Sequence, residues 1–516
     1  MATPQRPVVS FKGTPLHCYF EENKPGKDHG TRSLHGGAVS IAARGINAVV
    51  QIGSVLFLAR LLSPEDYGLV SMVMAFTGFA PVLVDLGTRD ALVQTARISE
   101  GEVSALFWFT IALGSTFALL TAACGPLIAH FYGEPRLTPI VLASSLTFVT
   151  CAFTVQHSAL MRRALMFREL AVIEVVTNLL SAAGAIAAAL LGFGYWALVV
   201  RPIATPLFFS AGVWLKCRWL PGKPTFTAGV RESLRFGFNI TAYCITDFAG
   251  RSSDRVAIGY RIGPRGLGQY QNALFVYDNL LDVLVFPLHG VAVAGLSKLR
   301  DNLTELRNSW SKALSTVAFY AMPAFGLLAV TSRDVVVILL GAKWASAGML
   351  LSVLAFRGIP NCVERTLGWL HVSAGRSDRW MRWGVFATCA QFVALLCGLP
   401  FGPMGVAFAY VVSMFVLFVP AVAYAGRPFD IGPADVISIV GRQLTGALAA
   451  AGIGFLLRVI LLRGTPPLLR AVVLSAVYLA AYLTIVIGIL RVRAPLRVML
   501  VLIRSSLPPR VAGLLA

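Results

Sequence analysis

Charged residues are scarce in this chain. Asp, Glu, Lys and Arg make up 13% of its 516 residues, whereas soluble domains carry about 25%. Hydrophobic residues account for 57%, and the mean hydropathy is +0.73. This balance excludes an ordinary soluble domain and indicates a membrane protein with many spans. The net charge of +20 reflects basic loops between apolar runs, so we expect no nucleic-acid partner.

Several functional signatures are missing as well. The ATP-binding pattern G-x-x-x-x-G-K-[ST] does not occur, and PGKP at 221–224 lacks its second glycine and its hydroxyl, so direct ATP drive is not expected. The eight cysteines stand singly, which argues against a metal site, a redox motif or a disulfide framework. The first 38 residues are polar and have no apolar core, so they predict a flexible cytoplasmic tail instead of a secretory signal peptide. We expect no catalytic residue and no cofactor.

Apolar runs dominate the rest of the chain and predict an all-α polytopic membrane protein with about fourteen transmembrane helices. The expected spans are 39–61, 68–88, 105–129, 138–160, 170–191, 194–215, 234–256, 268–290, 312–331, 347–371, 380–399, 403–425, 440–462 and 468–490. With both termini in the cytoplasm, about 29 Lys and Arg fall in inner loops and about 10 in outer loops. The reverse orientation would invert this ratio, so we predict cytoplasmic termini.

An internal repeat divides the chain. Pro64 and Gly68 in RLLSPEDYG match Pro264 and Gly268 in YRIGPRGLG at an offset of 200. VLASSLTF at 141–148 matches MLLSVLAF at 349–356, at an offset of 208. GFGYWAL matches GPMGVAF, with Gly194 aligned to Gly405 at an offset of 211. Because six spans separate the matched segments, the repeat predicts two six-helix lobes related by a pseudo-two-fold axis along the membrane normal.

The repeat also predicts the domain boundaries. Residues 1–38 form the tail, 39–220 the N-lobe with spans one to six, and 221–425 the C-lobe with spans seven to twelve. Spans thirteen and fourteen, within 426–490, form an appendage, and 491–516 a basic cytoplasmic tail.

Ionisable residues follow one face of the seventh and eighth predicted spans. In the seventh span, Tyr243, Asp247, Arg251 and Asp254 share a face, with Arg255 one step round. A charge at the bilayer centre costs on the order of 3 kcal/mol. The spacing therefore predicts a polar cavity, although snorkelling charges or structural ion pairs between helices are the alternatives.

The same pattern occurs on two further spans. On the eighth, the polar face is formed by Gln271, Asp278, Asp282 and His289. On the first, it is formed by Ser40, Arg44, Asn47, Gln51 and Ser54. A helix–helix seam is the alternative for the first span, because Ser and Asn often bond between packed helices, but an arginine does not suit a dry seam. Asp85, Arg89 and Asp90 end the second span, so spans one, two, seven and eight carry most of the intramembrane charge around a predicted central cleft.

A run of motifs resembles a known family. The motifs are ARLLSPEDYGLVSMV (59–73), LVDLGTRDALVQ (83–94), LFWFTIALG (106–114), FYGEP (131–135), MRRALMFREL (161–170), GFGYWALV (192–199) and LGQYQNAL (267–274). Together they resemble the polysaccharide-unit flippases of the MOP superfamily, of the lipopolysaccharide, exopolysaccharide or colanic-acid exporter type, over residues 38–425. The resemblance implies alternating access between two lobes, a cationic cavity, and transfer of an undecaprenyl-diphosphate-linked oligosaccharide across the bacterial inner membrane.

The resemblance gives the polar residues expected roles by position and charge. Arg44, Arg251 and Arg255 are the candidates for binding the diphosphate, because arginine offers phosphate a bidentate contact. Other expected substrate contacts are Asn47, Gln51, Tyr243, Gln269, Gln271, Asn272 and Asn279, for which a general polar lining is the alternative. Asp247, Asp254, Asp278 and Asp282 either couple transport to H⁺ or Na⁺ or neutralise the arginines. We favour neutralisation for Asp254 and coupling for Asp278 and Asp282, since no Arg or Lys shares the helix face of the latter two.

The sequence leaves several alternatives open. Glu174, Arg357, Glu364 and Arg365 lie in peripheral spans, where structural pairs are expected. The rival functions are a lipid II flippase, a multidrug/cation antiporter of the same superfamily, and a membrane enzyme of polysaccharide assembly. A polysaccharide polymerase and a chain-length regulator are the expected protein partners.

Overall fold

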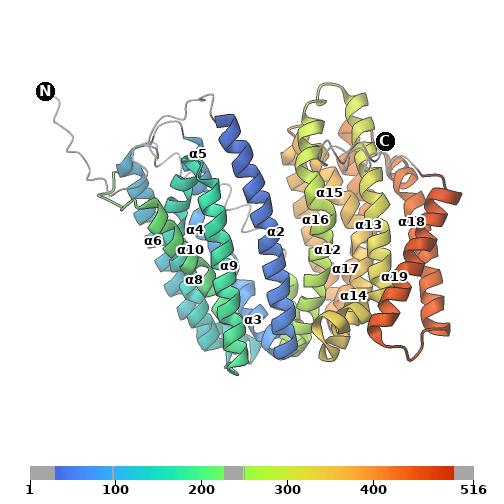
Figure 1. The fold of residues 1–516 in the computed structure, drawn as a ribbon, viewed down its shortest axis with the longest axis horizontal. Helices are drawn as coiled ribbons and strands as arrows, with labels where there is room; N and C mark the ends of the chain where they lie inside the picture. The colour runs from blue at the N-terminus through green and yellow to red at the C-terminus, as the bar shows by residue number, and fades with distance from the viewer. Residues whose placement is uncertain are drawn as a thin grey trace. The chain divides into compact units, whose positions relative to one another are not determined.

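The computed structural model describes residues 29–95, 98–225, 230, 248, 250 and 252–492. All regular structure in these residues is helical, and the chain divides into two compact units, Met1–Val256 and Ala257–Ala516 (Figure 1). The helices of the N-terminal unit are α2 (His29–Leu61), α3 (Pro64–Thr77), α4 (Ala80–Asp85), α5 (Thr88–Gln94), α6 (Glu100–Ala123), α7 (Gly125–Tyr132), α8 (Leu137–Arg163), α9 (Phe167–Leu190) and α10 (Trp196–Cys217). Those of the C-terminal unit are α12 (Pro264–Ser297), α13 (Leu303–Leu340), α14 (Ala345–Leu354), α15 (Gly358–Ser373), α16 (Ser377–Gly398), α17 (Gly402–Gly426), α18 (Pro433–Ile460) and α19 (Pro467–Leu483).

Eleven helical segments in the described part of the chain are long and apolar enough to cross a membrane, and a bent pair within α12 brings the number to twelve. One of the eleven, Asp378–Phe429, covers both the eleventh and the twelfth predicted spans. Thirteen of the fourteen predicted ranges overlap these helices. The seventh, 234–256, lies mostly outside the described residues, so the count of fourteen stays a prediction.

The start of α3 shows how the sequence sets a helix boundary. Ser63 accepts a hydrogen bond at Oγ from the Asp66 N–H, and the Asp66 carboxylate accepts one from the Ser63 N–H at 2.8 Å. This capping box satisfies two otherwise unpaired N–H groups, and Pro64 in the first turn needs no hydrogen bond there. The SPED tetrad is therefore a helix start, and it places Tyr67 on the buried side of α3.

The second predicted span is interrupted. α3 ends at Thr77, α4 at Asp85, and the left-handed residues Leu86 and Gly87 separate α4 from α5. In α12, the two straight parts Pro264–Val285 and Leu288–Ser297 meet at an angle of 42°. The breaks at 86–87 and 286–287 differ by 200 residues, which is also the offset between the motifs that begin the two segments.

Backbone positions with positive φ recur at similar offsets. They pair as Gly133 with Gly341, Leu165 with Gly375, Gly192 with Gly402 and Arg218 with Asp430, at offsets of 208, 210, 210 and 212. Each of these residues lies at or just beyond the end of a helix. Gly133, Arg218 and Asp430 have the left-handed conformation that closes a last turn, whereas Gly341 and Gly402 combine a positive φ with an extended ψ. The turns after Arg163 and Ser373 share the same backbone bonds, from Met166 N–H to the Met161 carbonyl and from Arg376 N–H to the His371 carbonyl.

α8 is the central helix of the N-terminal unit and packs against α6, α10 and the segments of the second span. Aromatic side chains fill one end of this contact. His157 stacks on Trp214 with ring centroids 4.2 Å apart, both rings lie beside Phe107, and His157 also lies beside Trp219. The connection after α10 is held to α6, because Trp108 Nε1 donates to the Gly222 carbonyl and Gly222 N–H donates to Ser104 Oγ.

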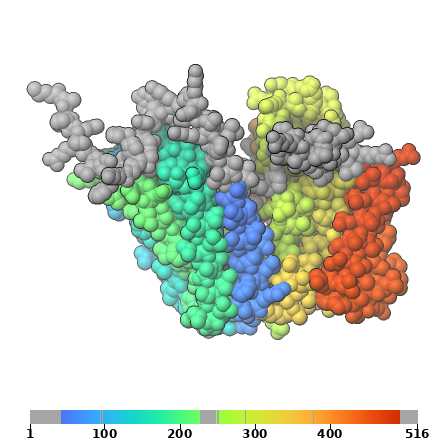
Figure 2. Space-filling view, in the orientation of Figure 1, coloured from blue at the N-terminus to red at the C-terminus, as the bar shows by residue number. Residues whose placement is uncertain are grey.

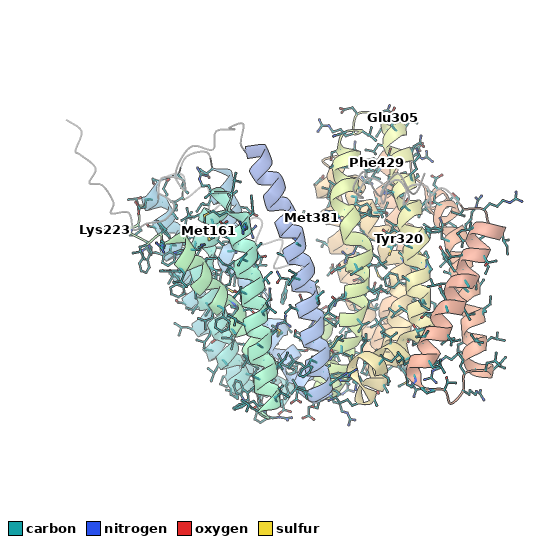
Figure 3. The ribbon with its side chains drawn as sticks, in the orientation of Figure 1. Met161, Lys223, Glu305, Tyr320, Met381 and Phe429 are labelled. Atoms are coloured by element: carbon teal, nitrogen blue, oxygen red, sulfur yellow. The ribbon has the colours of Figure 1, made fainter. Side chains whose placement is uncertain are left out.

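In the C-terminal unit α13 is central. Tyr320, labelled in Figure 3, donates from α13 to the Leu284 carbonyl of α12 at 2.8 Å. α18 and α19 pack on another side of α13, where Tyr482 donates to the Phe319 carbonyl at 2.7 Å. The buried Asp334 carboxylate of α13 binds Arg470 of α19 at 2.8 Å (Nε) and Arg458 of α18 at 3.3 Å. The last two spans are thus fixed to this unit by a buried ionic cluster.

Candidate functional site

The residues on the polar face of α2 are of two kinds, those bonded to neighbouring helices and those that are exposed. Asn47 Oδ1 accepts a hydrogen bond from Asn178 Nδ2 of α9 at 3.1 Å. Ser54 is buried, and its Oγ accepts a hydrogen bond from Arg201 Nη1 of α10 at 2.7 Å. Arg44 and Gln51 are exposed. The seam interpretation therefore fits Asn47 and Ser54, whereas Arg44 and Gln51 remain available to a ligand.

The seam continues between α9 and α10. Thr205 Oγ1 donates to Ser181 Oγ at 3.0 Å, and Ser181 is fully buried. We call the six residues Asn47, Ser54, Asn178, Ser181, Arg201 and Thr205 the N-unit seam. Figure 2 shows α2 beside α9 on the surface of this unit, and the three helices pack against one another in the order α2, α9, α10.

Arg201 is the functional candidate that the sequence analysis missed. Its side chain is half-buried, and no carboxylate lies within ion-pair distance of it among the described residues. The signal was present, because Arg201 is the one charged residue between Trp196 and Leu215. A lone charge forms no repeating pattern along a helix face, so the spacing of charges does not single out Arg201.

Part of the seventh-span cluster lies outside the described residues, namely Tyr243, Asp247 and Arg251. The rest can be placed. Asp254 is buried at 5% exposure, and its Oδ1 accepts a hydrogen bond from the Arg255 N–H at 2.7 Å. Arg255 is half-buried, and its Nε has no hydrogen-bond partner. Phe248 packs on Phe79 with ring centroids 5.5 Å apart, which brings this segment against the break between α3 and α4.

The eighth-span acids point to a partner from another helix. Asp282 is exposed and lies 3.6 Å from Arg365 of α15. Asp278 is exposed as well, and its charge acts on Arg357. A helix wheel shows only the residues of one helix, so it could not reveal these basic partners. Arg365 forms a pair, as expected, but with a residue that we had assigned to coupling.

Arg357 is held mainly by aromatic rings. Its guanidinium lies 5.5 Å from the Tyr277 ring centroid and 5.0 Å from that of Tyr410. Asn361 Nδ2 donates to Tyr277 Oη at 3.0 Å and fixes the first ring. Cation–π contacts of this kind stabilise a charge without a direct acidic neighbour, so Arg357 has a built-in partner within the unit.

The amides of the eighth span have separate roles. Gln269 is buried, donates to the Lys343 carbonyl at 3.1 Å and accepts from the Ala347 N–H at 2.9 Å. Asn272 is 1% exposed, and Asn279 donates to the Phe275 carbonyl of its own helix. Gln269 is therefore a packing residue, not a sugar contact. Gln271 is half-buried with an unpaired Oε1 and keeps its place among the candidate polar contacts.

A small cavity of about 20 Å³ lies between α15, α16 and α17. Its polar lining comes from Glu364, Trp383 and Gln391, and the indole of Trp383 lies beside the Glu364 carboxylate. A cavity of this size holds about one water molecule. Glu364 thus lies beside a cavity, and the charges of Arg357 and Arg365 act on it, as expected for a residue with a structural role. Glu174 of α9 lacks an ion pair within the described residues. These residues contain no group of three or more His, Cys, Asp or Glu that could hold a metal ion.

A family model described as "Polysaccharide biosynthesis protein" matches residues 57–348, which is more than half of the chain. The chain belongs to this polysaccharide biosynthesis family. The resemblance to polysaccharide-unit flippases that the motifs indicated is thereby confirmed at the level of the family.

Individual relatives agree with this assignment. The lipopolysaccharide biosynthesis protein WzxC of Escherichia coli (strain K12) is 26% identical over 394 residues, covering 72% of this chain and 78% of WzxC. The succinoglycan biosynthesis transport protein ExoT of Rhizobium meliloti (strain 1021) is 28% identical over 306 residues, covering 58% and 61%. Among solved structures, the lipid II flippase MurJ in an inward closed conformation superposes with a TM-score of 0.68 at 13% identity, covering 86% of this chain and 99% of MurJ. This last likeness shows the fold.

The family motifs shape loops as well as helices. In FYGEP, Gly133 adopts a left-handed conformation and ends α7. Arg136, just beyond the motif, binds Glu134 at 2.7 Å and Glu65 of α3 at 2.6 Å. The hydrogen bond from Arg136 holds the pKa of Glu134 below its usual value. The loop before α8 is thereby tied to the start of α3.

Proposed function

We propose that this protein is a flippase that moves an undecaprenyl-diphosphate-linked oligosaccharide across the bacterial inner membrane for exopolysaccharide or lipopolysaccharide biosynthesis. The observation that carries the proposal is that Arg44 and Arg201, in the spans of the N-terminal unit, have no carboxylate partner among the residues that the structure describes. Family membership and the biosynthesis and transport named for WzxC and ExoT support the same reading.

Charge explains why this arrangement suits such a substrate. A diphosphate carries negative charge that must stay solvated or paired while it crosses the apolar layer. An arginine already neutralised by a carboxylate has little attraction left for phosphate, whereas a free guanidinium offers a bidentate contact. The lipid tail can remain in the bilayer if the path opens sideways, so that only the headgroup needs polar side chains.

We infer the finer architecture from the repeat. Fourteen spans in two six-helix lobes with an appendage would give the two lobes the same orientation in the membrane. The recurrence of the positive-φ residues and of the break in the second helix of each unit supports a duplication. The distribution of basic loop residues supports cytoplasmic termini. Transport would then proceed by alternating access at a cleft lined by spans one, two, seven and eight.

Cation coupling is part of the proposal, with H⁺ or Na⁺ as the ion. The pair with Arg365 favours neutralisation as the role of Asp282. Asp278 and Asp247 remain the coupling candidates, together with the buried Asp254. A polysaccharide polymerase and a chain-length regulator are the proposed partners, since each would receive the flipped unit.

A lipid II flippase is the nearest rival, because MurJ shares the fold. The names of the sequence relatives favour polysaccharide synthesis over lipid II. A multidrug/cation antiporter would be expected to have a net acidic cavity, which unpaired arginines do not favour. A membrane enzyme of polysaccharide assembly fits the family membership least.

The test is deletion of the gene followed by analysis of lipid-linked intermediates. We expect completed oligosaccharide on its lipid carrier to accumulate in the cytoplasmic leaflet while secreted polymer is lost. Normal polymer secretion in a strain with no second member of the family would contradict the proposal. Accumulation of an incomplete oligosaccharide would favour an enzyme instead.

A further inference from the structure

Arg201 occupies an unusual position for a charged side chain. It is the sixth residue of α10, about 8 Å along the axis from the start of that helix. Ser54 lies seven residues before the end of α2, at a comparable depth. The guanidinium is half-buried, and its one described hydrogen bond is to a neutral hydroxyl. A charge at this depth is costly unless it faces water or receives an anion.

Several other buried or half-buried arginines have carbonyl or carboxylate acceptors. Arg163 donates to the carbonyls of Leu92 and Thr95. Arg379 donates to the Tyr424 carbonyl at 2.8 Å and lies over the ring of that residue. Arg458 and Arg470 share the Asp334 carboxylate. Against this background, Arg201 differs because a serine hydroxyl is its acceptor and no carbonyl or carboxylate acceptor is found for it among the described residues.

The contact with Ser54 orients Arg201 without neutralising it. Ser54 Oγ donates to the Gln51 carbonyl at 2.9 Å and so presents a lone pair to the guanidinium. A guanidinium has five N–H groups in a planar fork, of which this contact uses one. The remaining groups match two oxygens of a phosphate, which arginine binds bidentately.

We propose that Arg201, positioned by Ser54, is an anion-binding residue for the diphosphate of the carrier lipid. Arg201 would form a second anion-binding position on the N-terminal unit, separate from Arg44, because its partner Ser54 lies ten residues, or about 15 Å, along α2 from Arg44. In the predicted orientation Arg44 serves the cytoplasmic half of the path and Arg201 the periplasmic half. The inference rests on the proposed function and adds to it the residue that receives the headgroup before release.

The test is binding of farnesyl diphosphate to the full chain in phosphatidylcholine nanodiscs, followed by calorimetry. We expect Arg201→Gln to weaken binding about tenfold, since a charge-assisted bidentate contact is lost. Ser54→Ala should weaken it by a smaller factor, because the charge stays and only its orientation is lost. Arg442→Gln, which removes an exposed arginine of α18, is the matched control and should leave binding unchanged.

A second binding experiment with inorganic pyrophosphate distinguishes a lipid-linked diphosphate from a free one. Arg201→Gln should affect the lipid diphosphate more than pyrophosphate, because the lipid is held in the membrane at the depth of this residue. An effect on pyrophosphate alone would overturn the proposal.

Equal affinity of folded Arg201→Gln and Arg442→Gln for farnesyl diphosphate would overturn the role of Arg201 and leave the proposed function in place. If the wild type bound farnesyl diphosphate no better than farnesol, the proposed function would fail together with the inference. Should Arg201→Gln not fold, Arg201→Lys replaces it, and loss of the fork predicts about threefold weaker binding. An unchanged affinity of Arg201→Lys would then count against the proposal.

Discussion

The two units differ in the partners of several arginines within their spans. In the C-terminal unit, arginines within the spans have partners of their own: Arg357 has tyrosine rings, Arg365 has Asp282, and Arg458 and Arg470 have Asp334. In the N-terminal unit, Arg89 pairs with Asp85. Arg44 is exposed and has no ion pair among the described residues, and Arg201 is bound to a serine. A paired arginine holds helices together, whereas an unpaired one attracts an anion. We therefore assign most of the electrostatic attraction for the substrate to the N-terminal unit.

The largest functional effect is expected at Arg44. Arg44→Gln should lower polymer export about tenfold, because the neutral amide has similar length but no charge to attract a phosphate. Arg44→Lys should keep partial activity as a point charge without the bidentate fork. The measurement is export per unit of inserted protein. Equal activity of the two variants would remove Arg44 from the substrate path and weaken the contrast between the units.

The largest stability effect is expected in the C-terminal unit. Asp334→Asn leaves Arg458 and Arg470 without their carboxylate and should destabilise the fold by about 3 kcal/mol. Thermal unfolding in detergent, followed by the fraction of monodisperse protein, measures the loss. Asp378→Asn, at an exposed pair 3.9 Å from Arg382, is the control and should change little. If the two variants melt alike, the cluster does not fix the last two spans.

A smaller effect on stability is expected at the ion pair between Asp282 and Arg365. Both side chains are well exposed, and the two charged groups are 3.6 Å apart. Neutralising either residue should therefore lower the free energy of unfolding by about 0.5 kcal/mol. Neutralising both should cost less than the sum of the two single losses, because the interaction between them can be lost only once. Export should fall little in either. Loss of ion-gradient dependence in Asp282→Asn alone would instead restore the coupling role that the sequence suggested for this residue.

The smallest effect is expected at the loop after FYGEP. Because Arg136 lowers the pKa of Glu134, this interaction stabilises the fold above the unfolded-state pKa of about 4.3. The stabilisation is lost as the pH falls through the lower, folded-state value. The pair is largely exposed, so Arg136→Ala should cost a few tenths of a kcal/mol at pH 7, and this cost should shrink as the pH falls through the folded-state pKa of Glu134. A difference that persists unchanged at low pH would assign the loop's stability to packing.

The sequence predicted some levels of this structure better than others. Hydropathy located thirteen of the fourteen expected ranges because a membrane helix must be apolar along its whole length. The motif around Ser63 and Pro64 marked a helix start for local reasons that one short segment contains. The pairing of Asp282 with Arg365 and of Asn47 with Asn178 depends on how separate helices pack, and no single helix face contains that information. The sequence shows Arg201 as a lone charge in a span. Its contact with Ser54, and the lack of an acidic side chain beside it among the described residues, are what indicate an anion-binding role.

The most direct test of the account is the leaflet in which the lipid-linked oligosaccharide resides when a deletion strain carries the variant Arg44→Gln/Arg201→Gln. At equal levels of inserted protein, we expect the completed oligosaccharide to accumulate in the cytoplasmic leaflet, as in the deletion strain itself. A strain carrying Arg365→Gln, which removes an arginine of the C-terminal unit, should deliver it to the periplasmic leaflet. Normal delivery by the double variant would contradict the claim that unpaired arginines of the N-terminal unit carry the diphosphate across the membrane.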